Sequence, residues 1–183
     1  MELDTRNTRV TFECSLGPLT VRGIFRELSG QLLLPNADIE RASVSIDVLA
    51  ASIDTGLPMR DRHLRGVSFL DSQHTPFVSY RSERVARNNG TLLVEGILSL
   101  RGVEREVSTT LPVAWAEQQG VAGTLSLTTA LTITRADYAV GVPRGIDILN
   151  PIFLAVGPVV VVQIEVVVPA TRLLPALLPA LGR

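Results

Sequence analysis

The residues with the clearest chemical potential stand close together at Arg60, Asp61 and His63. If this stretch is helical, Arg60 and His63 share one face because they are three residues apart. An arginine fork can bind a phosphate or donate to a quinone carbonyl, so one interpretation is contact with a polar head group. The interpretation we favour is structural: Arg60 and Asp61 pair with backbone and hold the helix in place.

Arg135 ends an apolar strand pattern and raises a similar question. A buried arginine without a partner costs too much free energy to persist. We therefore expect Arg135 to pair with Asp137 or Asp61, or to extend its charged end to the rim of the fold. Together with Arg60, Asp61 and His63, it forms the set predicted to bind a head group or to hold the helix.

Catalysis and metal binding have weaker support. An enzyme would use His63 and Asp61 as an acid–base pair on a lipid substrate. A serine hydrolase would need a G-x-S-x-G elbow, which the sequence lacks. His63 and His74 are the only histidines, and their spacing fits no compact metal motif. We expect the protein to be no enzyme and to hold no metal or cofactor. Cys14 is the single cysteine, and we expect it to be a small buried apolar side chain.

The totals are those of one globular domain. The chain has 183 residues, of which 46% are hydrophobic and 19% charged. Its formal net charge of -1 gives no overall attraction to nucleic acid, so no nucleic-acid partner is expected. The N-terminal residues lack the apolar core of a secretory signal, and the apolar run 156–168 is too short to span a bilayer. These features predict a cytoplasmic location.

The elements that must position these residues are strands, because the dominant period is two. From Val121 to Arg135 the odd positions are mostly apolar and the even positions are small or hydroxylated, which is typical of a strand with one wet face. The same alternation begins at Val10, Val44, Leu92, Val103 and Val160.

Turn signals separate these stretches at 35–38, 88–90, 101–102 and 118–120. Strands joined by short turns pair antiparallel. The sequence therefore predicts an all-β protein of about eight antiparallel strands, which can close into a barrel just wide enough for a small ligand. A two-sheet sandwich is the competing architecture.

The alternation stops between Ala50 and Pro76. Asp54 and Thr55 as caps, with Pro58 in the first turn, predict one short helix at about residues 57–65, docked over one end of the barrel.

The chain divides into a barrel domain, residues 1–168, and an apolar tail, residues 169–183, which is interrupted by prolines. The tail is either a floppy end or a segment that packs on the barrel, on a partner or on a membrane surface. The sequence allows a transient membrane contact through this tail, and it also allows a homodimer.

An ordered set of short motifs, spread over roughly residues 10–140, resembles the YceI-like family of polyisoprenoid-binding proteins. The matching pieces are Val21-Arg22-Gly23 with Phe25, Ser29-Gly30, Ser52-Ile53-Asp54-Thr55, Arg60-Asp61-Arg62-His63-Leu64, Phe69 with Asp71 and Pro76, Gly96 with Leu98, Leu100-Arg101-Gly102-Val103, and Arg135 with Tyr138. The resemblance implies a lipocalin-like barrel that holds an isoprenoid chain, such as a quinone tail or a polyprenyl phosphate. Residues 142–162 depart from the resemblance, being longer and more apolar.

On this basis the chain is expected to bind, sequester or transport an isoprenoid or other long-chain amphiphile. Burying one five-carbon unit gains roughly 3–4 kcal/mol, so lumen shape and length must select the chain. The alternatives are the barrel enzyme and an interaction module with a filled core. The predicted lumen residues are Phe12, Val21, Phe25, Val44, Ile46, Val48, Phe69, Phe77, Leu98, Leu100, Leu125, Leu127, Leu131 and Ile133.

Overall fold

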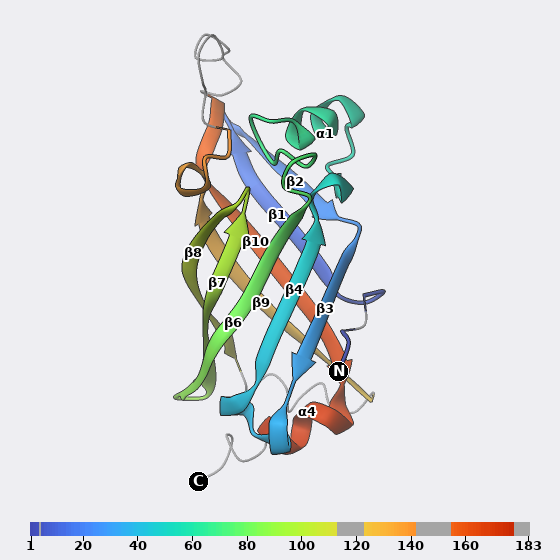
Figure 1. Ribbon diagram of the computed structural model, residues 1–183, viewed down its shortest axis with the longest axis vertical. Coiled ribbons are helices and arrows are strands. Elements are labelled where there is room, and N and C mark those ends of the chain that lie inside the picture. Colours follow the sequence, from blue (N-terminus) through green and yellow to red (C-terminus); the bar gives the residue numbers. More distant parts are fainter. Residues whose placement is uncertain (4, 113–122, 142–154, 178–183) are drawn as a thin grey trace.

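The fold consists of two antiparallel five-stranded sheets that face each other (Figure 1). The computed structural model describes residues 1–3, 5–112, 123–141 and 155–177. The first sheet has the order β5 (Ile53–Asp54), β2 (Leu19–Phe25), β1 (Arg9–Leu16), β10 (Val156–Pro169) and β9 (Thr124–Thr134). The second has the order β3 (Leu28–Leu33), β4 (Ser43–Leu49), β6 (Phe77–Asn88), β7 (Thr91–Leu100) and β8 (Val103–Pro112).

The prediction of a mostly β protein with antiparallel sheets is confirmed, but the closed eight-stranded barrel is not. In the described residues, β8 and β9 come together without a backbone ladder between them. Threonine hydroxyls join them instead: Thr109 Oγ1 donates to the Ala130 carbonyl at 3.0 Å, and Thr129 Oγ1 donates to the Thr110 carbonyl at 3.2 Å. The two sheets therefore meet along this edge and remain separate sheets.

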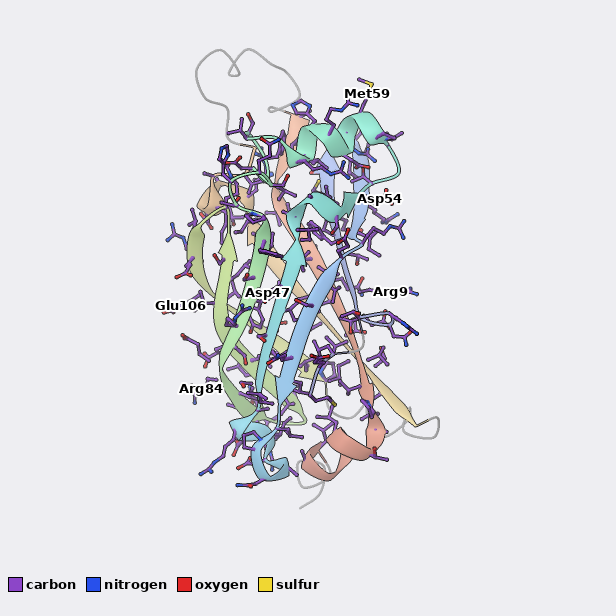
Figure 2. All side chains as sticks on the ribbon, turned by 45° about the vertical axis from the view of Figure 1, so that its right-hand side comes forward. Arg9, Asp47, Asp54, Met59, Arg84 and Glu106 are labelled. Carbon is purple, nitrogen blue, oxygen red and sulfur yellow. The ribbon has the colours of Figure 1, made fainter. Side chains whose placement is uncertain are left out.

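The pleat of the strands divides apolar from polar side chains. Along β7 every second residue is buried, including Leu92, Val94, Leu98 and Leu100. Charged side chains such as Arg9, Asp47, Arg84 and Glu106 project from the outer faces (Figure 2). Because both inner faces are apolar, the core lies between the sheets.

Two of the predicted turns have the backbone geometry that tight hairpins need. The φ angles are 42° and 78° at Asn89 and Gly90, and 54° and 72° at Arg101 and Gly102. Positive φ at both central residues matches the right-handed twist of the flanking strands. The turn predicted at 118–120 lies outside the described residues.

Helices close the two opposite ends of the sheets (Figure 1). Helix α1 (Pro58–Arg65) confirms the helix predicted at 57–65, although it starts without a side-chain cap, because Asp54 accepts from the Gly56 amide instead. Helix α4 (Ala170–Leu177) occupies part of the predicted tail, and its Leu173, Ala176 and Leu177 are buried. Short 3-10 turns at Pro35–Ala37, Ile39–Arg41, Ala50–Ser52 and Arg135–Tyr138 complete the described connections.

In the described part of the chain, no helix combines the length and the apolar character that crossing a bilayer requires.

Gly96 allows β6 and β7 to approach closely. A side chain added at this position is therefore expected to lower the stability of the fold. A Cβ at Gly96 would lie 2.3 Å from the Arg81 carbonyl oxygen and 2.8 Å from the Tyr80 hydroxyl. We expect Gly96→Ala to lower the free energy of unfolding by about 1–3 kcal/mol in urea denaturation. The control is Glu95→Ala on the outer face, expected to change it by less than about 1 kcal/mol. Equal effects of the two variants would contradict the packing that the structure shows.

Candidate functional site

Two apolar cavities lie in line between the sheets. The α1 chamber, at the end closed by α1, has a volume of about 150 Å³, and the α4 chamber, at the other end, about 110 Å³. A dry apolar cavity of about 150 Å³ is large enough for a benzene-sized guest. The two chambers together form the candidate site, which we call the lumen.

Four side chains form the wall shared by both chambers: Ile46 and Tyr80 from the second sheet, and Leu131 and Ile164 from the first. The Tyr80 hydroxyl is buried and has no hydrogen-bond partner among the described residues. Burial raises the pKa of Tyr80 to about 12, so this phenol stays protonated at neutral pH. The wall therefore separates the two chambers and contains a buried hydroxyl without a hydrogen-bond partner among the described residues.

Most of the predicted lumen residues line one chamber or both. The α1 chamber is lined by Phe12, Phe25, Ile46, Val48, Phe69, Leu98, Leu100, Leu131 and Ile133, and the α4 chamber by Val44, Ile46, Leu127 and Leu131. Most of them lie on strands, each of which turns one face inward. Their contact with a ligand stays a prediction.

Three predicted lumen residues lie elsewhere. Phe77 is 54% exposed: it begins β6, whose inner positions are Val78 and Tyr80, and a shift of one residue turns a side chain to the other face. Val21 and Leu125 are buried but are not among the residues that line either chamber.

Several lining residues were missed. Val162 and Ile164 belong to the alternating stretch that begins at Val160, so the period of two identifies them as inward-facing. Tyr80 gave no comparable signal. Leu173 and Leu177 of α4 line the α4 chamber, yet they fall in the segment that was separated from the barrel as a tail.

Helix α1 is held to the first sheet by its own polar side chains. The Asp61 carboxylate accepts from the Thr55 amide at 2.9 Å and from the Thr55 hydroxyl. Arg60 donates to the Thr55 hydroxyl and carbonyl, both at 2.7 Å, and Arg65 donates to the Ile53 carbonyl at 2.8 Å. Since Asp61 is only 6% exposed, these bonds replace water and fix the helix over the end of the lumen.

The side chains of Asp61 and His63 contact different residues. Asp61 is directed to Thr55, whereas the ring of His63 meets the ring of Phe69 edge-on at 5.5 Å between centroids. Phe69 in turn lines the α1 chamber. This geometry favours a structural part for both residues, since an acid–base pair needs the two groups aimed at one proton.

Arg135 stands beside the α1 chamber and donates to four backbone carbonyls. Its guanidinium reaches the carbonyls of Gly157 at 2.7 Å, Val156 at 2.9 Å, Val140 at 3.0 Å and Gly141 at 2.5 Å. These bonds replace the expected pairing with Asp137 or Asp61 and tie the start of β10 to the segment after β9. Burial lowers the pKa of Arg135, but a guanidinium remains charged at any physiological pH.

Polarity is distributed unevenly along the lumen. Arg135 is the one charged side chain among the described residues that line either chamber, and it lies in the α1 chamber. The α4 chamber has hydrocarbon walls with the hydroxyls of Ser43, Thr109 and Thr129 as its small polar groups, besides Tyr80 in the shared wall. Both chambers are therefore apolar, and they differ in that the charged lining residue lies at the α1 end.

These features define a class of protein: a β fold whose two sheets enclose a dry, elongated interior suited to an apolar guest. The profile of the YceI-like domain matches residues 1–168. The chain therefore belongs to the YceI-like family, as its ordered motifs predicted.

Individual relatives agree with this assignment. A UPF0312 protein of Shewanella denitrificans is 32% identical over 110 residues, 58% of this chain and 58% of its own length. A UPF0312 protein of Vibrio cholerae is 31% identical over 93 residues, 50% of this chain and 49% of its own length. The matched stretch thus spans between about half and three fifths of these curated relatives.

Solved structures share the fold at low sequence identity. BcnA of Burkholderia cenocepacia superimposes with a TM-score of 0.77 at 22% identity, covering 91% of this chain and 99% of that one. A polyisoprenoid binding domain from Saccharophagus degradans, implicated in plant cell wall breakdown, gives 0.64 at 18% identity, covering 91% and 95%. The Campylobacter jejuni YCEI protein gives 0.61 at 20% identity, covering 81% and 84%.

The anchoring of α1 yields a stability prediction. Asp61→Ala removes the acceptor of two buried Thr55 donors and is expected to lower the free energy of unfolding by about 1–3 kcal/mol. Arg62→Ala, an exposed position on the same helix, is the control and should stay within about 0.5 kcal/mol. Chemical denaturation of both variants measures this. Equal stabilities would mean that the Asp61 bonds do not hold the helix.

The reactivity of Cys14, the single cysteine, tests whether the α1 chamber excludes water, because Cys14 lines this chamber. Burial raises the pKa of the Cys14 thiol more than the nearby charges of Arg135 and Arg60 lower it. Since only the thiolate reacts, alkylation of the folded protein by iodoacetamide should be slow at neutral pH and rise about tenfold per pH unit up to the raised pKa. The unfolded chain is the control and should level off at a lower pH. A plateau near neutral pH in the folded protein would contradict this.

Proposed function

We propose that this protein binds an isoprenoid-chain lipid of the quinone or polyprenyl phosphate type in its lumen, and sequesters or carries it without chemical change. The observation that carries this proposal is the pair of dry chambers in line between the sheets, with a charged group at one end only. A long amphiphile has the same asymmetry, an apolar chain with one polar end.

The direction of the ligand follows from that asymmetry. The apolar chain extends toward the α4 chamber, where burial of each methylene gains about 0.8 kcal/mol. The polar end stays near α1 and Arg135. Because the carbonyls around Arg135 already use its donors, the head group interacts with its charge more than with free hydrogen-bonding sites.

A chain of several isoprene units needs more room than either chamber has. Binding it therefore requires Ile46, Tyr80, Leu131 and Ile164 to move apart and join the chambers. The β8–β9 edge offers a place for the sheets to adjust, since hydroxyl bonds and not a continuous ladder join them there. The polyisoprenoid binding domain of Saccharophagus degradans, which shares the fold, adds support.

The rival functions have less support. An interaction module with a filled core is disfavoured because two cavities lie between the sheets. An enzyme using Asp61 and His63 is disfavoured because Thr55 occupies the Asp61 carboxylate at the outer side of the lumen. Membrane contact through the tail is disfavoured because the side chains of Leu173, Ala176 and Leu177 are buried and cannot contact lipid.

Neighbouring positions of β10 allow a matched test. Val162 lines the α1 chamber, whereas Val161 lies on the outer face. We expect Val162→Phe to fill the chamber and weaken binding at least about tenfold, a loss of about 1.4 kcal/mol. Val161→Phe should bind as the native protein does.

The measurement is native mass spectrometry, first of the purified protein for a co-purified lipid, then after adding an isoprenoid quinone or a polyprenyl phosphate. Equal binding by both variants would place the ligand outside the lumen. If the native protein takes up neither probe and carries no lipid, the proposed function is wrong.

A further inference from the structure

We infer that helix α4 is the floor of the lumen and sets the longest chain that this protein binds. The inference rests on the proposed function and names the part of the chain that determines specificity. Leu173 and Leu177 are each 2% exposed, and both line the α4 chamber. Helix α4 lies at the end of the sheets opposite α1 (Figure 1). Arg135 lines the other chamber, together with Leu64 of α1.

The floor is fixed in place by its connection to the first sheet. Strand β10 runs directly into α4, and the Ala170 amide donates to the Gly123 carbonyl at 3.0 Å. Ala176 is fully buried, so the helix packs closely against the core at this position. α4 also contacts the turn at Pro35–Ala37, which belongs to the opposite side of the fold. The helix therefore spans the opening between the two sheets.

Helix α4 lies just beyond the stretch that the family profile matches. The YceI-like profile ends at residue 168, two residues before α4 begins. A chain that passes the shared wall meets Leu173 and Leu177 end-on. Each further unit must then displace well-packed side chains, so the affinity falls abruptly at one chain length instead of declining gradually.

The test compares chain-length profiles of full-length variants. Prenyl alcohols of two to eight isoprene units are the probes, and native mass spectrometry measures the occupancy by each. Leu173→Ala deepens the floor, and Leu177→Phe raises it. Val168→Ala is the control, because Val168 is 1% exposed next to α4 but is not among the residues that line either chamber.

We expect Leu173→Ala to bind the first alcohol beyond the native cut-off at least tenfold more tightly than the native protein does. Leu177→Phe should shorten the cut-off, and Val168→Ala should leave it unchanged. Since the two α4 variants shift the cut-off in opposite directions, either one that folds decides the question. An unchanged cut-off in these variants would overturn the floor while the proposed function stands. Failure of the native protein to bind any alcohol, together with no uptake of the quinone or the polyprenyl phosphate and no co-purified lipid, would overturn both.

Discussion

The packing of four large side chains across the gap between the sheets organises the whole interior. Ile46 and Tyr80 meet Leu131 and Ile164 there, and they form the wall between the chambers. Facing sheets lie about 10 Å apart, so side chains of this size from both faces fill the space at one level. Gly96 makes room for the Tyr80 hydroxyl, because any Cβ there would collide with it. On each side of this wall the filling is incomplete, and a chamber remains.

Both ends of the lumen are closed by helices whose attachments differ in kind. At one end, α1 is held by bonds from Arg60, Asp61 and Arg65 to the backbone and side chain of the segment before it. At the other end, α4 is held mainly by burial of leucine and alanine side chains. A short helix is marginal alone, so each needs the sheets to persist. The polar attachment suits the end where a head group would lie, and the apolar attachment suits the end of a chain.

The arginine side chains near the lumen donate hydrogen bonds mostly to backbone carbonyls. Arg135 ties Val156 and Gly157 to Val140 and Gly141, and Arg101 donates to the carbonyls of Ala139 and Val67. These bonds assemble irregular segments around the α1 chamber, where ladder hydrogen bonds are not available. They also leave the positive charge of Arg135 beside an apolar cavity.

The sequence by itself determined the mainly β character, the antiparallel pairing, the short helix and the family, because a period of two and a set of local motifs are properties of neighbouring residues. It placed residues such as Phe12, Ile46 and Leu131 on the lumen, and it erred at Phe77 through a shift of one residue. Only the tertiary structure decided that the sheets stay separate, that a wall divides the lumen and that α4 closes it. Those outcomes depend on which side chains meet across the fold, and no local pattern records such contacts.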